Sequence, residues 1–342
     1  MRTIDWEPEK NSIVMIDQTL LPREYKVIEC STVDCLCEAI ISLRVRGAPA
    51  LGAAGGFGVA LAAQRSRASS LDGVMKDIEA AGRTIISTRP TAMNLSGGVK
   101  RVISAVMDAS NAKEARNFAL DEAKAIAYED VEKNMELGEH GAMLLEDGDT
   151  VMTHCNAGRL ACVDWGTALG VIRSARAEGK DIKVISCETR PLNQGSRITT
   201  WELMEDKIPV TLITDSMSGH VMRRGMVDKV IVGADRITQD AVFNKIGTYT
   251  HSVVAKEHGI PFYVAAPVST FDFERMEDEI EIELRNPEEL KYFGNYQIAP
   301  LDVEVYNPAF DSTPMENVSA IITENGVFYP PFLLEEVKIK VT

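Results

Sequence analysis

The sequence lacks an excess of basic residues. It has 36 Lys and Arg against 51 Asp and Glu, so its 342 residues carry a formal net charge of -15. Nucleic-acid phosphates require a basic protein face, and this charge balance therefore argues against binding to DNA or RNA. A small anionic ligand remains compatible with the charge, because a few local Arg, Lys and backbone N–H groups can hold one phosphate.

Long apolar runs are also missing. The longest stretch of low polarity, residues 47–63, is rich in Gly and Ala and is shorter than a membrane-spanning helix. The amino-terminal residues lack the apolar segment of a signal peptide. We therefore expect a cytoplasmic protein without a membrane partner, of a length that allows two domains.

Cysteine is sparse and shows no paired framework. The six cysteines stand at positions 30, 35, 37, 155, 162 and 187, which in a chain of this length suits a reducing compartment. Cys35 and Cys37 lie near Cys30 but lack the further ligands of a zinc site, so we expect them in a helical core. The P-loop pattern and the glycine-rich dinucleotide fingerprint are absent as well. The sequence thus predicts no metal-ligand cluster and no cofactor.

The amino-terminal part shows a short β element followed by helical periodicity. Alternating apolar and polar residues around Leu20-Leu21-Pro22 predict a β-hairpin made from residues 12–17 and 24–29. Helical patterns then continue to about residue 145. They cover residues 32–44, 49–64, 70–87, 95–109 and 112–145. We therefore predict a mainly helical domain with a short β element over residues 1–145.

After Gly148 the pattern changes to short apolar strands that alternate with helices. The predicted strands are 150–154, 182–187, 210–214, 229–232 and 261–265. The helical patterns between them cover 164–178, 195–206, 216–224 and 245–258. This alternation is typical of an α/β fold with a doubly wound parallel sheet. We predict a Rossmann-like catalytic domain over residues 146–342 and an exposed loop and helix face at the acidic stretch 274–289.

Two strand ends carry residues suited to proton transfer. Cys155 follows the first predicted strand of this domain and stands before a glycine turn at Gly158, where α/β proteins bind small anions. A buried structural cysteine is the alternative. Asp235 follows the strongly apolar strand 229–232, at a place for a general acid or base or for a capping residue. We expect Asp235 to be shielded from water, which would raise the pKa of its carboxyl.

Four further segments could bind an anion or hydroxyl groups. Arg46, with the N–H groups of Gly47 and Ala48 before Pro49, forms either a phosphate cradle or a tight helix–helix contact. Arg89 lies in a loop before Asn94, which marks the start of the next helix, and either binds phosphate or is only solvated.

On the sheet side, Gln194 is expected near the ligand edge, beyond the loop that holds Glu188 and Arg190. Those two charges could also form a loop ion pair. Asn244 is polar, and Lys245 could contact a phosphate or orient Asp235. The whole set predicts proton transfer on a phosphorylated small molecule.

Taken jointly, these runs resemble the 5-methylthioribose-1-phosphate isomerase family. The resemblance rests on Arg46-Gly47-Ala48-Pro49-Ala50, Arg89-Pro90-Thr91-Ala92-Met93-Asn94-Leu95, His154-Cys155-Asn156-Ala157-Gly158, Glu188-Thr189-Arg190-Pro191, Gln194-Gly195-Ser196-Arg197, Gly233-Ala234-Asp235-Arg236, Asn244-Lys245-Ile246-Gly247-Thr248 and Asn307-Pro308-Ala309-Phe310-Asp311-Ser312-Thr313-Pro314. That family is homologous to the regulatory α, β and δ subunits of the translation-initiation guanine-nucleotide exchange factor, and related to archaeal ribose-1,5-bisphosphate isomerases.

The resemblance implies a homodimer that converts an aldose 1-phosphate to a ketose 1-phosphate in methionine salvage. It implies that Cys155 and Asp235 are the catalytic pair. The residues that it implies for substrate binding are Arg46, Gly47, Ala48, Arg89, Gln194, Asn244 and Lys245.

The sequence departs from the family pattern at two places. Ser96-Gly97-Gly98 follows Asn94-Leu95 where the family has an aromatic pair, and Arg159 follows the glycine turn where the family has an apolar residue. Both changes bear on the pocket for the 5-substituent of the sugar. Other pentose 1-phosphates, namely 5-deoxyribose 1-phosphate and ribose 1,5-bisphosphate, therefore stay open as substrates. A non-catalytic regulatory subunit stays open as well, although such a subunit has no need for the catalytic pair.

Overall fold

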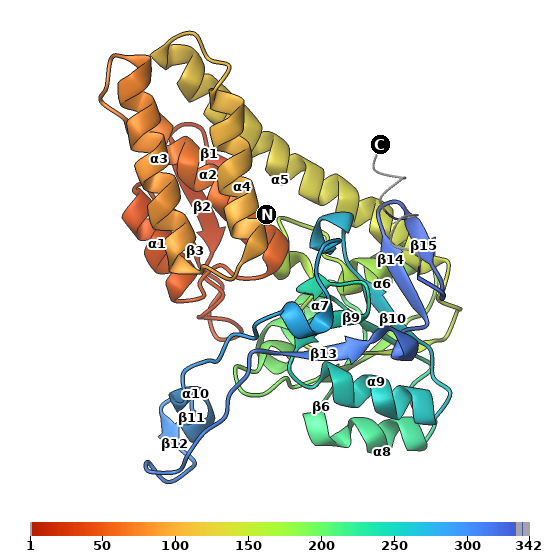
Figure 1. Cartoon of the computed structure of the whole chain (residues 1–342). Helices are drawn as coiled ribbons and strands as arrows, with labels where there is room; N and C mark the ends of the chain where they lie inside the picture. The colour runs from red at the N-terminus through yellow and green to blue at the C-terminus, as the bar shows by residue number, and fades with distance from the viewer. Residues whose placement is uncertain (1, 333–336, 338–342) are drawn as a thin grey trace. The chain divides into compact units, whose positions relative to one another are not determined.

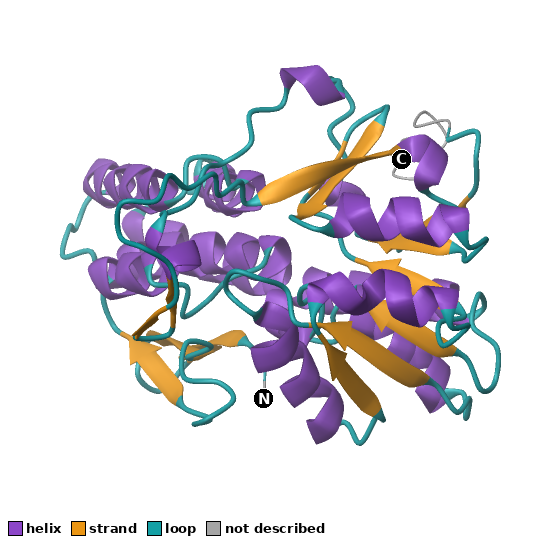
Figure 2. Ribbon diagram, turned by 90° about the horizontal axis from the view of Figure 1, so that it is seen from below, coloured by secondary structure: helices purple, strands orange, loops and turns teal. Residues whose placement is uncertain are grey.

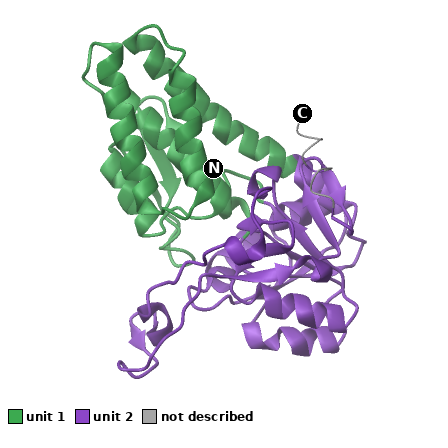
Figure 3. Ribbon diagram, viewed as in Figure 1, with its two compact units in different colours: residues 1–135, 157–166 green, residues 136–156, 167–342 purple. Residues whose placement is uncertain are grey.

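The chain folds into two units, seen in the computed structural model in Figures 1 and 3. The structure describes residues 2–332 and residue 337. Unit 1 comprises residues 1–135 and 157–166, and unit 2 comprises residues 136–156 and 167–342. None of the helices in the described part of the chain is long and apolar enough to cross a bilayer.

Unit 1 begins with a three-stranded antiparallel sheet. Its strands are β1 (Ile4–Glu7), β2 (Ser12–Ile16) and β3 (Val27–Cys30), in the order β1-β2-β3. The predicted hairpin is confirmed as the β2–β3 pair, in which Ile13 lies opposite Cys30. The sequence did not predict β1, which pairs with the other edge of β2.

Five helices follow this sheet along the chain. They are α1 (Val33–Ile41), α2 (Ala48–Arg65), α3 (Leu71–Thr88), α4 (Met93–Val106) and α5 (Ala112–Ala142). All five were predicted from the apolar periodicity. Glycine and alanine fill the buried α2, because its neighbours lie very close: a Cβ on Gly98 of α4 would lie 2.0 Å from the Gly52 carbonyl oxygen. The small-residue run of α2 therefore serves helix packing.

The last turns of α5 belong to unit 2. A Cβ on Gly141 would lie 2.4 Å from the Val171 side chain, and His140 Nδ1 lies 3.0 Å from the Thr323 carbonyl oxygen. The compact units therefore divide the chain at residue 135 and not at residue 145, and they assign residues 157–166 to unit 1. The domain boundary at residue 145 stays a prediction, because compact units need not be the units that fold alone.

Unit 2 is built on a seven-stranded sheet. Its order is β15-β14-β10-β7-β4-β5-β6, and all neighbours are parallel except β14 and β15. The strands are β4 (Thr150–Thr153), β5 (Lys183–Cys187), β6 (Val210–Ile213), β7 (Lys229–Val232), β10 (Phe262–Ala265), β14 (Ala320–Thr323) and β15 (Gly326–Phe328). The five predicted strands and the Rossmann-like parallel fold are confirmed, and β14 and β15 are additions.

Helices lie on both sides of this sheet, in front of and behind the orange strands in Figure 2. They are α6 (Ala168–Ala177), α7 (Thr200–Glu205), α8 (Ser218–Arg223) and α9 (Thr248–Glu257). The helix predicted to start at residue 195 begins with a wider π turn over Gly195–Thr199. In that turn Gly195 packs against the end of β5, where a Cβ would lie 1.7 Å from the Cys187 carbonyl oxygen.

A second, antiparallel sheet was not predicted. It contains β8 (Arg236–Ile237), β9 (Ala241–Lys245) and β13 (Phe310–Pro314), in the order β13-β9-β8. Lys245 therefore ends a strand, and the prediction that a helix starts there is wrong. The helix α9 starts at Thr248 because Gly247 turns the chain with φ 106° and donates its N–H to the Asp311 carboxylate at 2.7 Å.

The acidic stretch 274–289 forms the exposed loop that was predicted. It contains one short turn, Glu277–Glu279, and leads into α10 (Glu288–Lys291) and the small hairpin of β11 (Tyr292–Phe293) and β12 (Tyr296–Gln297). None of its residues is buried.

Candidate active site

The two predicted catalytic residues follow neighbouring strands at the point where the strand order of the sheet reverses. From β4 the chain continues outward through β5 and β6, and then returns to add β7 and β10 on the other side of β4. Ligands of doubly wound sheets bind at this switch point, outside the carboxyl ends of the strands. Met152 of β4 pairs with Val230 of β7, so Cys155 and Asp235 both follow strand ends at this edge.

Cys155 has a left-handed backbone that two threonines hold in place. Its φ is 63°, a conformation that costs a residue with a side chain about 1–3 kcal/mol and persists only where the surroundings enforce it. The Cys155 N–H donates to Thr189 Oγ1 at 2.8 Å, and Thr199 Oγ1 donates to the Cys155 carbonyl oxygen at 2.7 Å. The half-buried thiol therefore stands on a turn fixed from both sides.

A buried ionic network supports the second threonine. Asn156 Nδ2 donates to Thr199 Oγ1 at 3.1 Å and to Glu202 Oε1 at 2.9 Å. Glu202, completely buried, pairs with the Arg173 guanidinium at 2.8 Å, and Arg173 also pairs with Asp206 at 2.6 Å. No sequence motif indicated this network, because its members come from the segment after β4 and from the separate helices α6 and α7.

Asp235 differs from the expectation of a shielded carboxylate. It stands in the turn from β7 to β8 and is exposed, while its backbone N–H donates to the Phe243 carbonyl oxygen at 2.8 Å. The position is fixed by the pairing of β8 with β9. Asp235 is therefore held by its backbone at the sheet edge with its side chain open to the solvent.

Three predicted substrate-binding residues also belong to unit 2. Gln194 is buried, and its Oε1 has no hydrogen-bond partner in the described part of the chain. A buried, unpaired acceptor is costly, and a sugar hydroxyl would satisfy it. Asn244 Nδ2 donates to Thr248 Oγ1 at 3.0 Å. Lys245 donates to the Ala309 carbonyl oxygen at 2.6 Å and lies 4.8 Å from the centre of the Phe310 ring.

Four residues near Cys155 could hold a metal ion. His154, Cys187, Asp215 and His251 each offer a ligand atom within 4.8 Å of the others, and such a set suits Zn²⁺. That the protein works without a metal stays a prediction, and these four residues are the place where a metal would bind if it were wrong. The four residues come from four separate segments, so no spacing motif in the sequence could predict them as a group.

Hydrogen bonds already connect most of this cluster. His154 Nε2 donates to the Ile246 carbonyl oxygen at 2.8 Å, which leaves Nδ1 to accept from His251 Nε2 at 3.1 Å. Burial lowers the pKa of His154 to about 4 and that of His251 to about 3, so both rings are neutral at pH 7. The Asp215 carboxylate accepts the N–H groups of Thr189 and Arg190 at 2.8 and 2.7 Å. The hydrogen bonds of the cluster thus hold together the segments that follow β4, β5 and β6.

The remaining predicted binding residues belong to unit 1. Gly47 has φ 93° and is the N-cap of α2, without a side-chain hydrogen bond at the cap. A Cβ at Gly47 would lie 2.3 Å from the Ala161 carbonyl oxygen, so only glycine fits. Arg46 Nε donates to Gln18 Oε1 at 3.0 Å. The N-terminus of an 18-residue helix and an adjacent Arg suit a phosphate.

Arg89 caps the carboxyl end of α3 and is half-buried. The next helix, α4, starts at Met93 with Ala92 at the N-cap, so the prediction that Asn94 marks its start is wrong by two residues. The structure therefore places Arg89 in the short α3–α4 connection, where its side chain is still partly open to solvent.

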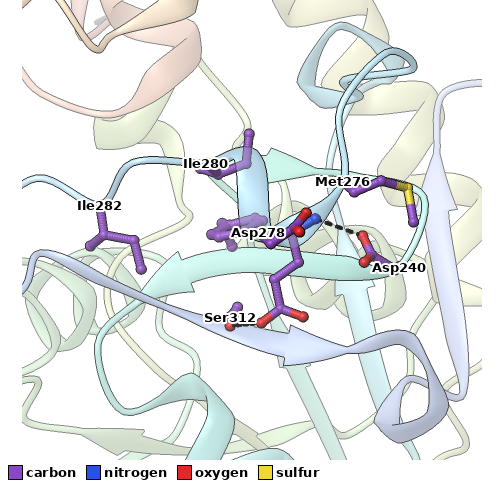
Figure 4. A pocket seen from close by; sticks show the side chains of 8 residues that line it. Asp240, Met276, Asp278, Ile280, Ile282 and Ser312 are labelled. Atoms are coloured by element: carbon purple, nitrogen blue, oxygen red, sulfur yellow. Dashed lines mark hydrogen bonds between the residues drawn. The ribbon is translucent and has the colours of Figure 1, made fainter.

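The pocket in Figure 4 is a poor phosphate site. It has a volume of about 540 Å³ and lies between the acidic stretch and the second sheet of unit 2. Asp240, Glu277 and Asp278 line it, together with Phe243, Met276, Ile280, Ile282 and Ser312. Three carboxylates without a basic side chain among the lining residues repel an anion. We therefore assign the candidate site to the sheet edge and not to this pocket.

Comparison with known proteins places the chain in a family. Residues 44–330 match the Initiation factor 2 subunit family. A relative from Methanosarcina acetivorans, provisionally named a methylthioribose-1-phosphate isomerase, is 68% identical over 99% of this chain and 97% of its own length. A methylthioribose-1-phosphate isomerase from Desulforamulus reducens is 47% identical over 99% of both chains.

Two crystal structures match the whole fold. The 5-methylthioribose 1-phosphate isomerase of Pyrococcus horikoshii is 44% identical with a TM-score of 0.93, covering 100% of this chain and 96% of its own. A protein described as translation initiation factor eIF-2B, subunit delta, from A. fulgidus is 59% identical with a TM-score of 0.91, covering 100% of both chains. The chain therefore belongs to the Initiation factor 2 subunit family, among the relatives named methylthioribose-1-phosphate isomerase.

Proposed function

We propose that this protein is an aldose–ketose isomerase that converts 5-methylthioribose 1-phosphate to 5-methylthioribulose 1-phosphate in methionine salvage. Relatives named for this substrate are 47–68% identical over nearly the whole chain. The observation that carries the proposal is that a rigidly held cysteine and an aspartate follow β4 and β7 at one switch point. As a cytoplasmic homodimer, the protein acts on a phosphorylated pentose and has neither nucleic-acid nor membrane partners.

The chemistry requires two proton-handling groups. Phosphate on the anomeric oxygen prevents the sugar from opening unaided to a free aldehyde. Isomerisation needs an acid that protonates the ring oxygen as the ring opens, and then either a base that removes the C2 proton or a hydride shift from C2 to C1 with a base that removes the O2 proton. Cys155 and Asp235 supply the acid and base for either route.

Seven residues bind the substrate in this proposal. The N–H groups of Gly47 and Ala48, with Arg46 and Arg89, bind the phosphate through charge-assisted hydrogen bonds. Gln194, Asn244 and Lys245 bind the sugar hydroxyls. The unpaired Oε1 of the buried Gln194 supports its role as an acceptor for a hydroxyl.

A second candidate is a regulatory subunit of a nucleotide-exchange assembly. The A. fulgidus structure that is 59% identical is described as translation initiation factor eIF-2B, subunit delta, which favours this candidate. A regulatory subunit does not need Cys155 and Asp235, whereas an isomerase does.

Turnover of three sugar phosphates separates these readings. We expect the purified protein to isomerise 5-methylthioribose 1-phosphate faster than 5-deoxyribose 1-phosphate and ribose 1,5-bisphosphate. A preference for another sugar would change the substrate but keep the reaction. If none of the three sugars is converted to a ketose, the result favours the regulatory-subunit candidate.

Replacing Arg89 should weaken the binding of the phosphorylated sugar. Arg89→Ala removes a charge-assisted hydrogen bond worth about 1.5–3 kcal/mol, so the dissociation constant should rise roughly ten- to hundredfold. Calorimetric titration with substrate and with dephosphorylated methylthioribose measures this. The dephosphorylated sugar should bind poorly to the wild type and lose little more in the variant.

Arg83→Ala is the matched control, because Arg83 lies on the same helix α3 and its side chain is 72% exposed. This control should bind both ligands as the wild type does. Equal weakening of both ligands by Arg89→Ala would show that Arg89 is structural and that the phosphate binds elsewhere.

Activity should survive removal of metals. Cys155 and Asp235 can transfer the protons without an added group, so turnover should be unchanged after exhaustive dialysis against a chelator, with no nicotinamide or flavin added. Initial rates of turnover, measured before and after dialysis, test this prediction. Activity that is lost and then restored by a metal would contradict the prediction and would point to the cluster around His154 and Cys187.

Thr199 should act as a positioning residue for Cys155. Thr199→Val removes the hydroxyl that donates to the Cys155 carbonyl oxygen, and the loss of a buried hydrogen bond costs about 1–3 kcal/mol. We expect kcat to fall about tenfold with KM little changed, because a difference of about 1.4 kcal/mol is tenfold in rate. Thr199→Ser keeps the hydroxyl and should restore the rate, whereas an unchanged kcat in Thr199→Val would remove Thr199 from this role.

A further inference from the structure

Two cysteines outside the candidate active site lie in very close contact. Cys30 is the last residue of β3, and Cys35 lies in the first turn of α1. Their Sγ atoms are 2.7 Å apart, although non-bonded heavy atoms usually approach only to about 3.5–4.0 Å. Two thiols at this distance can form a disulfide bond with little movement of the chain.

The backbone on both sides of this contact is fixed. Cys30 pairs with Ile13 in the sheet. The Cys35 N–H donates to the Oγ1 of Thr32, the N-cap of α1, at 3.2 Å. The short connection between β3 and α1 therefore presents the two side chains to each other.

The two thiols differ in their access to solvent. Cys30 is completely buried, whereas Cys35 is half-buried. Burial and the neighbouring Cys35 thiol raise the pKa of the Cys30 thiol. An oxidant from solution therefore reaches Cys35 first, and Cys30 is the partner that resolves the product.

We propose that Cys30 and Cys35 are a redox site that forms a reversible disulfide with a peroxide oxidant. Hydrogen peroxide transfers oxygen to the Cys35 sulfur, giving a sulfenic acid and one water. The Cys30 sulfur then attacks the Cys35 sulfur, and the sulfenic oxygen leaves as a second water with the Cys30 proton. Two thiols and one peroxide thus give one disulfide and two waters. The bond joins β3 to α1 within unit 1, and a dithiol reverses it.

Mass analysis of one tryptic peptide tests the proposal. Trypsin cleaves after Lys26 and after Arg44, so residues 27–44 form one peptide, which contains Cys30, Cys35 and Cys37. The folded, full-length protein is treated with hydrogen peroxide, denatured, alkylated with iodoacetamide and digested. We expect the peptide to carry one alkyl group and to have lost two hydrogens, and to carry three alkyl groups when dithiothreitol precedes alkylation.

Substitutions identify the pair. Cys37→Ser is the matched control, since Cys37 lies on the same peptide, and this variant should still lose two hydrogens. Cys35→Ser and Cys30→Ala should each abolish that loss. A wild-type peptide that keeps three alkylated cysteines after peroxide would overturn the proposal, and so would a bond that needs Cys37. The wild-type result does not depend on whether a variant folds.

Discussion

Cys155→Ser and Asp235→Asn should each lower kcat by about a hundredfold or more, the usual contribution of a general acid or base. Serine keeps the shape of the cysteine but transfers a proton poorly, and asparagine keeps the shape of the aspartate without its titrating oxygen. Both residues follow strand ends, so the strand pairing of the sheet should survive. Steady-state kinetics of the purified variants measure the effect.

Each variant has a matched control. Cys35→Ser removes another half-buried cysteine, and Asp278→Asn removes another exposed carboxylate. Both controls should keep the wild-type kcat, and circular dichroism should be the same for all four proteins. Near-normal turnover in Cys155→Ser or in Asp235→Asn would remove that residue from the mechanism.

Arg173→Met should cause the largest loss of stability. The substitution leaves the completely buried Glu202 carboxylate without its cation, and breaking a buried ion pair on one side costs about 3–5 kcal/mol. Urea unfolding followed by circular dichroism measures the free energy of unfolding. Because Glu202 also accepts from Asn156 next to Cys155, we expect a lower kcat in the folded variant.

Two further variants test whether the loss of stability comes from the buried ion pair. Arg176→Met on the same helix α6 breaks the pair with Asp181, whose side chain is 64% exposed, and should cost less than about 1 kcal/mol. Adding Glu202→Gln to Arg173→Met removes the buried negative charge and should recover part of the stability. Equal losses in Arg173→Met and Arg176→Met would contradict the role assigned to the network.

The main sheet of unit 2 could be predicted because its strands are short apolar runs between turn residues. The strand Lys229–Val232 is an example, since three of its four residues are apolar and buried. The second sheet could not be predicted in this way. β8 has only two residues, and the apolar run of β9 is limited to residues 241–243 before the polar Asn244 and Lys245, so neither shows the pattern of a complete strand.

The candidate site was predictable only in part for a similar physical reason. Cys155 and Asp235 could be named because each directly follows a recognisable strand. The groups that support them are distant in sequence: Thr199 follows Cys155 by 44 residues, and His251 follows His154 by 97. Only tertiary structure shows that these side chains meet.

The conversion of 5-methylthioribose 1-phosphate itself tests the central claim most directly. The sugar is incubated with wild-type protein and with the Cys155→Ser/Asp235→Asn double variant, and the ketone carbon of the product is followed by ¹³C NMR. We predict that the wild type forms 5-methylthioribulose 1-phosphate and that the folded double variant forms none above the uncatalysed background. A folded wild type that makes no ketose, or a double variant that makes it at the same rate, would contradict the account.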